Sequence, residues 1–390
     1  MKTFKGVVTY ILVWFDAALA YASRILKRCV KDQRVLRPCI IITMLGGVGD
    51  YILLTPVLME YRRLFPQWRV VMIVRSSNAE LATKDPSVDL VIALNYRGFR
   101  WNPIEKIRVW TNMIPLDVRL FVNADYSTHH EKHGRTLVNW SQAKRSIAFE
   151  CLDSGHERDY AAYGEIVGQD REWMFEIDRD YEMVRYLGAN CSVNYQTRIY
   201  GIERYLPPDH DILALAGRKY YVLFPGSSME EKCWPIDKFC DFVRAVERLD
   251  MEVVIAGGKN EQTLAHVINS LLPIRSIDLL GKTSLLDLSF VIKHASFILS
   301  NDTSAAHIAH AVGTKAFVIL GGGYYGRFLP YPAPSSVVPI VDYSYSECFR
   351  CRWNCIYPYW KCIKDNTVER VVSEVLGAMD RSKYARLGES

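Results

Sequence analysis

The stretch that decides the fold is Pro38–Asp50, with the sequence PCIIITMLGGVGD. Its first part, Pro38–Met44, is an apolar and β-branched run of the kind that forms a buried parallel strand. A glycine turn, Leu45–Asp50, follows, and Tyr51–Phe65 has apolar spacing that is compatible with a helix. A strand, a glycine turn and a helix in this order are typical of the opening of a nucleotide-binding α/β unit.

Similar apolar runs recur along the chain and alternate with helical stretches. The strands predicted after the first one are Val70–Val74, Leu90–Leu94, Val118–Val122, Tyr220–Phe224, Glu252–Ala256, Phe297–Leu299 and Ala316–Leu320. Strands that alternate with helices predict parallel sheets with helices on both faces. Residues 126–218, between the strands Val118–Val122 and Tyr220–Phe224, show no clear pattern of strands and helices. Within them, Pro207-Pro208 is a plausible linker. The pattern therefore predicts an α/β protein with two domains in tandem and a cleft between them.

The length of 390 residues and the ordinary composition support two globular domains. We expect an N-terminal helix over residues 1–36, a first domain over 37–210, a second domain over 211–365 and a final helix over 366–390. Lys plus Arg is 48 and Asp plus Glu is 43, which gives a formal net charge of only +5. Because no dense basic stripe is interleaved with aromatic residues, nucleic acid is not the expected partner.

The N-terminal run Gly6–Ser23 is apolar and is flanked by lysines and arginines. A cleaved signal peptide is disfavoured, because the run contains Asp16 and basic residues follow it at once. A spanning helix would place Asp16 near the bilayer centre, at a cost of about 2.5–3.5 kcal/mol. Three interpretations stay open: residues 6–28 lie in a membrane interface, pack on the protein or an oligomer partner, or span the bilayer. We expect a cytoplasmic protein, peripheral at the inner face of the cytoplasmic membrane in the first case.

Asp50 is the first candidate site residue. It follows the first strand, at the carboxyl end of the sheet, where α/β proteins bind ligands. Gly47 and Gly49 let the backbone of the turn approach a ligand closely. The alternative is that Asp50 only caps the helix that follows.

A second motif follows the strand Tyr220–Phe224. Ser227 and Ser228 offer hydroxyls and backbone N–H groups, and Lys232 follows four residues later. Such a loop can hold a pyrophosphate through hydrogen bonds and one point charge. A polar loop with a solvated lysine is the competing interpretation.

A third motif opens the helix predicted over Thr303–Val312. Asp302 or Thr303 could be only its N-cap, but the same helix end can bind anions, and a carboxylate suits sugar hydroxyls. His307 lies one turn along the helix from Ser304, so both side chains can face one cleft. A lone histidine on such a helix is more often structural.

Four of the ten cysteines lie within fifteen residues, with the spacing C-x₂-C-x₃-C-x₆-C: Cys348, Cys351, Cys355 and Cys362. The short first pair is similar to the knuckle of a thiolate metal site, and four soft sulfur donors favour zinc or iron. We predict a structural metal there. The competing interpretations are reduced free cysteines or two disulfides, and disulfides are disfavoured in cytosol.

Together, the motifs GGVGD, PGSS-x₃-K-x-WP and GKTSLLDL…SNDTSAAHIAHAVGTK resemble in order and spacing those of the family 9 glycosyltransferases. The best-known members are ADP-heptose:lipopolysaccharide heptosyltransferases. The resemblance covers roughly residues 39–375. It implies a GT-B fold of two Rossmann-like, doubly wound domains that face a central cleft. The N-terminal domain would bind the acceptor and the C-terminal domain the nucleotide sugar.

The resemblance also implies residue roles in an inverting displacement. Asp50 would be the base, while Ser227, Ser228 and Lys232 would hold the diphosphate and Thr283 would lie by the adenine. The segment Asp302–Ser304 would contact donor sugar and phosphate, with Ser304 standing where the family has glycine. No cofactor would be required for transfer, and the final helix would pack back across the domain seam.

We therefore expect an inverting glycosyltransferase that moves a heptose or a related sugar from a nucleotide-sugar donor, with ADP-heptose as the expected donor, to a bacterial lipopolysaccharide core. A protein O-heptosyltransferase that modifies an autotransporter adhesin is a second possibility, because such family members carry a four-cysteine iron site at this position. A non-catalytic sugar-nucleotide-binding protein and an epimerase with the same fold also stay open.

Overall fold

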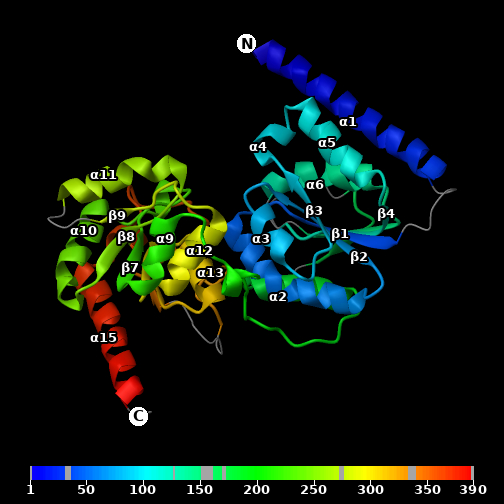
Figure 1. Cartoon of the computed structure of the whole chain (residues 1–390). Coiled ribbons are helices and arrows are strands. Elements are labelled where there is room, and N and C mark those ends of the chain that lie inside the picture. The colour runs from blue at the N-terminus through cyan, green and yellow to red at the C-terminus, as the bar shows by residue number, and fades with distance from the viewer. Residues whose placement is uncertain are drawn as a thin grey trace. The chain divides into compact units, whose positions relative to one another are not determined.

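The computed structural model consists of two compact α/β units (Figure 1). The N-terminal unit comprises residues 1–172 and 177–194, and the C-terminal unit comprises 173–176 and 195–390. The structure describes residues 2–30, 37–125, 128–150, 161–168, 173–271, 276–332 and 340–387.

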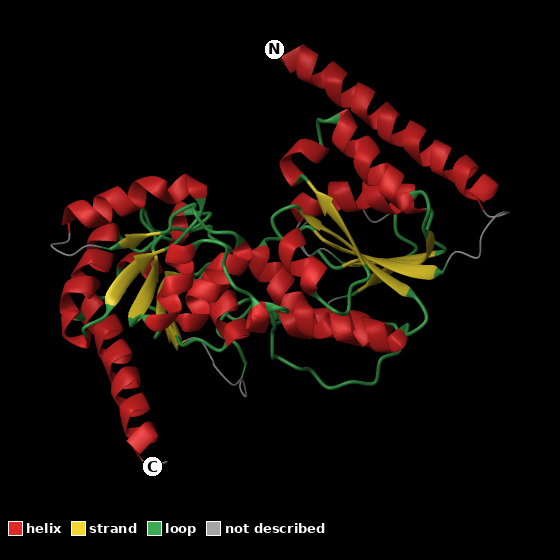
Figure 2. Ribbon diagram, viewed as in Figure 1, coloured by secondary structure: helices red, strands yellow, loops and turns green. Residues whose placement is uncertain are grey.

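Each unit contains a sheet with helices packed around it (Figure 2). The sheet of the N-terminal unit is parallel throughout and has the strand order β3-β2-β1-β4-β5-β6. This order is that of a Rossmann fold. Its strands are β1 Pro38–Met44, β2 Arg69–Arg75, β3 Leu90–Leu94, β4 Asp117–Asn123, β5 Arg145–Phe149 and β6 Glu165–Val167.

The C-terminal unit repeats this topology. Its parallel sheet has the order β12-β11-β10-β7-β8-β9, which is the same arrangement when the strands are counted from β7. The strands are β7 Tyr220–Phe224, β8 Glu252–Ile255, β9 Ile277–Asp278, β10 Ile298–Asn301, β11 Ala316–Ile319 and β12 Ile340–Asp342. The predicted fold of two Rossmann-like units is therefore confirmed.

Helices flank both sheets. Those of the N-terminal unit are α1 Lys2–Val30, α2 Val48–Leu64, α3 Ala79–Lys84, α4 Tyr96–Phe99, α5 Pro103–Met113 and α6 Thr128–Ser141. Helix α8, Glu176–Tyr186, begins at the last residue of the short insert 173–176. The later helices are α9 His210–Ala214, α10 Ile236–Ala245, α11 Gln262–Leu271, α12 Leu285–His294, α13 Ser304–Val312, α14 Lys361–Lys364 and α15 Val368–Leu387.

The central strand β1 shows why the apolar runs become strands. Residues Cys39–Met44 are all buried, with β2 on one side and β4 on the other. A strand covered on both faces can carry apolar side chains at every position, not only at alternate ones. Burial of such runs removes about 25 cal/mol of unfavourable free energy per Å² of apolar surface.

The two units divide at residue 194, earlier in the chain than the expected boundary near 210. The reason is that residues 195–205 pack with the C-terminal unit. The hydroxyl of Thr197 bonds Nδ1 of His310 at 2.7 Å, and the hydroxyl of Tyr205 donates to Asp287 at 2.7 Å. Pro207-Pro208 therefore lies inside the C-terminal unit and is not the linker.

Helix α1 packs along the N-terminal unit, beside α5 and α6 (Figure 1). Both oxygens of Asp16 accept from the Lys106 ammonium, at 2.6 and 2.7 Å, and the Trp140 indole donates to the Asp16 carbonyl. Asp16 therefore has a partner on the protein itself. Among the described residues, no helix combines the length and apolar character that crossing a bilayer requires.

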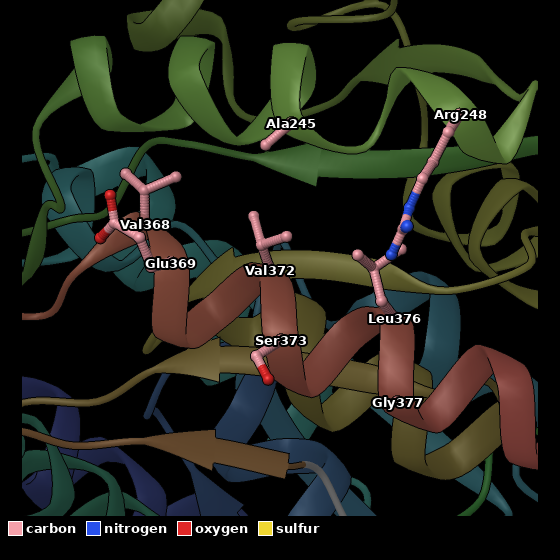
Figure 3. Close-up of a pocket in the computed structure, with 8 residues that line it drawn as sticks. All are labelled: Ala245, Arg248, Val368, Glu369, Val372, Ser373, Leu376 and Gly377. Atoms are coloured by element: carbon pink, nitrogen blue, oxygen red, sulfur yellow. The ribbon is translucent and has the colours of Figure 1, made fainter.

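Helix α15 packs against α10 of the same unit, and a groove of about 560 Å³ lies between them. Val368, Val372 and Leu376 point into this groove from successive turns of α15, and Arg248 lies opposite (Figure 3). None of the predicted site residues lines it. That α15 also crosses the domain seam stays a prediction.

Candidate functional site

Asp50 lies in the first turn of α2, just after the glycine turn. Its Oδ2 accepts a hydrogen bond of 2.6 Å from the backbone N–H of Gly47, so Asp50 does cap the helix. The cap holds the carboxylate over the turn: a Cβ added at Gly46 would lie 2.7 Å from Asp50 Oδ2. The glycine at position 46 is therefore needed for the close approach of this side chain. Asp50 itself is partly exposed.

Two further side chains fix the turn from opposite sides. Asp125, just after β4, accepts through Oδ1 from the N–H groups of Leu45 (2.6 Å) and Gly46 (2.9 Å). The Asn78 amide donates to the carbonyls of Gly46 and Gly47, each at 3.2 Å. Since β1 and β4 are parallel neighbours, their carboxyl ends bring Asp50 and Asp125 to the same edge of the sheet.

Asp125 is buried, and its Oδ2 has no hydrogen-bond partner among the described residues. Burial raises the pKa of Asp125 to about 7, and the nearby charge of Asp50 adds to this effect, while the two backbone N–H groups oppose it. Asp125 is not among the residues predicted from the sequence. The signal that could have identified it is a carboxylate three residues after the fourth predicted strand.

In the C-terminal unit, Lys232 and Asp302 come together although 70 positions separate them in the chain. The Lys232 ammonium donates to Asp302 Oδ2 at 2.7 Å, and the two side chains are only 15% and 7% exposed. Lys232 is therefore not a solvated lysine. It lies beside the start of α13, where the helix dipole also favours negative charge.

Asn301, the last residue of β10, organises the loop around this pair. Its amide donates to the Pro225 carbonyl at 2.6 Å, and its oxygen accepts from the Trp234 N–H at 3.0 Å. One buried side chain thus ties the PGSS loop to the entry of α10. Thr303 is the N-cap of α13, with its hydroxyl accepting from Ala305 N–H at 3.3 Å.

His307 and His310 lie on the buried face of α13, against Tyr331. Nδ1 of His307 is 2.9 Å from the Tyr331 hydroxyl, and the His310 ring stacks on the Tyr331 ring at 3.8 Å. Burial lowers the pKa of both histidines to about 4, so both stay neutral. The charges of Asp302 and Lys232 also act on the pKa of His307, which places this histidine close to the ion pair.

The remaining predicted donor residues lie in loops of the C-terminal unit. Ser227 is partly exposed and Ser228 is exposed, in the loop after β7, while Thr283 lies in the turn before α12. Glu261 is a carboxylate that the sequence analysis missed. A Cβ added at Gly226 would lie 2.1 Å from its Cδ, so Glu261 lies directly against the PGSS loop.

The cysteine-rich segment contributes Trp353 to the same region. Its ring lies across two glycines after β11: a Cβ at Gly321 would be 2.4 Å away, and one at Gly323 2.5 Å. The Lys232 ammonium is 5.6 Å from the centre of this ring. The segment between the cysteines therefore forms one wall beside the lysine.

The four clustered cysteines are free thiols. Sγ of Cys348 is 4.0 Å from Sγ of Cys355, and Sγ of Cys362 accepts from the Gly322 N–H at 3.3 Å. Burial opposes ionisation of Cys348, but hydrogen bonds from Ser346, Cys355 and Cys351 lower the pKa of its thiol overall. Among the described residues no set of three or more ligands has metal-binding geometry. The four-sulfur metal site therefore stays a prediction.

Residues 188–356 match the family model described as glycosyltransferase family 9 (heptosyltransferase). The chain carries a family 9 glycosyltransferase domain. The chain is 22% identical over 293 residues to lipopolysaccharide heptosyltransferase 3 of Escherichia coli K12, covering 70% of this chain and 79% of the relative.

Solved structures of family 9 enzymes share its fold. ADP-heptose lipopolysaccharide heptosyltransferase II of E. coli superposes with a TM-score of 0.67 at 14% identity, covering 88% of this chain and 99% of that one. The iron-containing dodecameric glycosyltransferase TibC from enterotoxigenic E. coli H10407 superposes with a TM-score of 0.55 at 14% identity, covering 90% and 80%. The fold is therefore GT-B, and the chain is a glycosyltransferase, as predicted.

Proposed function

We propose that this family 9 glycosyltransferase transfers a heptosyl group from ADP-heptose to the core of a bacterial lipopolysaccharide, with inversion at the anomeric carbon. The Lys232–Asp302 pair at the start of α13 carries the proposal, because a cation and a carboxylate beside a helix N-terminus could hold a sugar diphosphate. The names of the similar proteins, lipopolysaccharide heptosyltransferase 3 and ADP-heptose heptosyltransferase II, support the donor and the acceptor.

Departure of ADP is the step that the C-terminal unit would assist. As the bond between the anomeric carbon and the diphosphate oxygen breaks, negative charge develops on the diphosphate. Lys232, the hydroxyls of Ser227 and Ser228 and the N-terminus of α13 would stabilise this charge. Of these groups, the Lys232 side chain is largely shielded from water. Such groups provide the charge stabilisation that a metal ion would otherwise supply, so transfer needs no cofactor.

Recognition of the donor would involve the two carboxylates of this site. Asp302, held by Lys232 at 2.7 Å, suits hydroxyls of the heptose. Glu261, which lies against the PGSS loop just beyond β8, suits the hydroxyls of the ribose, as acidic residues do in related nucleotide-binding folds. Thr283 would lie by the adenine.

Asp50 would act as the general base in the N-terminal unit. As the acceptor hydroxyl oxygen forms its bond to the anomeric carbon, its proton passes to the carboxylate. The Gly47 N–H bond to Oδ2 holds this carboxylate in place, so capping and catalysis are compatible roles for one side chain.

A protein acceptor is the second candidate function. It is favoured by the four-cysteine segment and by the likeness to TibC, an enzyme described as iron-containing. We propose that Cys348, Cys351, Cys355 and Cys362 hold one structural iron or zinc ion. The 4.0 Å between the sulfurs of Cys348 and Cys355 is near the roughly 3.8 Å edge of a tetrahedral thiolate site. Its role would be to fix the loop that carries Trp353.

We also propose that residues 6–28 touch the inner face of the cytoplasmic membrane, where a lipid-linked acceptor is accessible. This proposal is supported by the exposed apolar side chains of α1, among them Trp14 at 63% and Tyr21 at 65%.

One assay tests the activity. The protein is incubated with ADP-, GDP- and UDP-sugars, with and without lipid A-core, and nucleotide release is measured. Release from ADP-heptose that depends on lipid A-core is the expected result. Release that depends instead on an adhesin polypeptide would support the protein acceptor, and no acceptor-dependent release from any donor would refute a transferase.

A further inference from the structure

A pocket of about 430 Å³ lies under α1, on the side of that helix that faces α4, α5 and α6. Its lining includes four cations and two large rings: Arg97, Arg100, Lys106, Arg135, Tyr96 and Trp101. The pocket belongs wholly to the N-terminal unit and contains none of the residues assigned above to transfer.

The pocket is strongly positive. Asp16 is the one carboxylate among its lining residues in the described part of the chain, and Lys106 already neutralises it through both oxygens. Arg97 and Arg100 are exposed and add two positive charges to this lining. His133, on the same wall, responds to this environment: burial, together with Lys106 and Arg100, lowers its pKa to about 4. These features favour an anionic ligand.

The outer face of α1 is apolar. Ile11, Trp14, Ala18, Tyr21 and Ile25 are exposed at spacings of three and four residues, so they form one stripe along the helix. Tryptophan and tyrosine prefer the interface between water and lipid, and an in-plane helix buries such a face about 5–10 Å deep.

The stripe and the pocket lie on different sides of the same helix. Successive residues of a helix are rotated by about 100°, so Leu12 and Asp16, which line the pocket, lie on the face of α1 opposite Trp14 and Tyr21. The two faces are separated by the diameter of the helix, about 10 Å. If the stripe enters the acyl boundary, the pocket lies at the level of the phosphate groups. A free anion would explain the pocket but not the stripe, and a second copy of the chain would explain the stripe but not the pocket.

We propose that this pocket is a lipid-headgroup site: α1 lies in the plane of an anionic membrane, and Arg97 and Arg100 bind the phosphate of one phospholipid. The inference rests on the proposed membrane contact of α1 and not on heptosyl transfer. It adds a defined ligand site to that contact.

The test is co-sedimentation of the full-length protein with vesicles of phosphatidylcholine alone or mixed with phosphatidylglycerol. We expect preferential binding to the mixed vesicles. The double variant Arg97→Gln/Arg100→Gln should lose about 30-fold of the affinity for them, since each cation at a membrane surface contributes about 1 kcal/mol. The matched control Lys84→Gln/Lys144→Gln removes two cations from elsewhere on the same unit and should lose far less.

Several results would overturn the proposal. Equal losses in the two double variants would show a diffuse charge effect and no headgroup site. Quenching of tryptophan fluorescence by inorganic phosphate, without vesicle binding, would show a free-anion site. A dimer in sedimentation equilibrium that Trp14→Ser dissociates, again without vesicle binding, would show that a second copy covers α1.

Thermal unfolding of each variant checks that the fold is kept. Vesicle binding needs no donor and no acceptor. A failed transfer assay would therefore refute heptosyl transfer and leave this site standing. Failed vesicle binding would refute this site and the membrane contact of α1, and leave heptosyl transfer standing.

Discussion

Replacing Asp125 by asparagine should stabilise the protein in neutral and alkaline solution. Burial moves the pKa of this carboxyl from its ordinary value of 3.8 to about 7 in the folded state. Between these values the unfolded chain releases the proton while the folded chain keeps it, so stability falls as the pH rises. At about 1.4 kcal/mol per pH unit, the full penalty is about 4 kcal/mol above pH 7.

The variant removes this penalty and keeps the turn. The amide oxygen of an asparagine can accept the N–H groups of Leu45 and Gly46 that Asp125 Oδ1 accepts now. Urea unfolding of wild type and variant, compared at each pH, measures the difference in free energy of unfolding. Between about pH 5 and about pH 8, the free energy of unfolding of the variant relative to wild type should rise by about 2.5 kcal/mol.

Asp85→Asn is the matched comparison, because Asp85 is also buried in the N-terminal unit and accepts the Ser87 N–H at 2.8 Å. Burial raises the pKa of Asp85 only to about 6. The difference in free energy of unfolding between wild type and Asp85→Asn should change by about 1.4 kcal/mol over the same pH range. This difference should level off about one pH unit lower than the one for Asp125→Asn. A wild-type–Asp125→Asn difference that stays constant with pH would refute the assignment of a buried, proton-retaining Asp125.

Four further predictions concern the proposed sites. Asp50→Asn should reduce turnover by about 10²–10⁴-fold with donor affinity retained; near-normal turnover would leave Asp50 as a helix cap only. Lys232→Ala should weaken donor binding in calorimetry and slow transfer, whereas the control Lys238→Ala, which removes an ammonium bonded to the carbonyls of residues 364 and 366, should change neither. Elemental analysis of untagged protein should find one iron or zinc ion per chain, and this metal should be lost when the four clustered cysteines are replaced by serine. Metal retained in the serine variant, or no metal in the wild-type protein, would refute the site. Because burial lowers the pKa of His310 to about 4, the free energy of unfolding should decrease as the pH falls below about 6.5. The variant His310→Gln should make this decrease smaller, and an unchanged decrease in the variant would contradict the prediction.

The strands that could be predicted are those buried on both faces. The predictions for Leu90–Leu94 and Tyr220–Phe224 have the bounds that the structure shows. Strand β5, Arg145–Phe149, was missed because it begins with polar residues, and β9 has only two residues. Such elements are strands because their neighbours pair with them, which local sequence does not encode.

The candidate site could likewise be predicted only in part. Asp50 and Lys232 could be located, because glycine turns and hydroxyl-rich loops mark the ends of strands. The contact of Lys232 with Asp302, and the position of Trp353 beside that lysine, depend on how distant loops meet. The raised pKa of Asp125 depends on burial, which a sequence shows only after its fold is known.

The short insert Trp173–Glu176 limits how the chain can be cut. It ends at the first residue of α8 but belongs to the C-terminal unit. There Phe175 contacts Tyr331 with ring centres 5.3 Å apart, and Glu176 pairs with Arg327 at 3.2 Å. A fragment that begins at residue 195 would lose these contacts beneath the helix that carries His307 and His310. An isolated C-terminal fragment would therefore need the insert grafted back, for example by circular permutation. Interchange of whole units between similar proteins would need three crossover points in place of one.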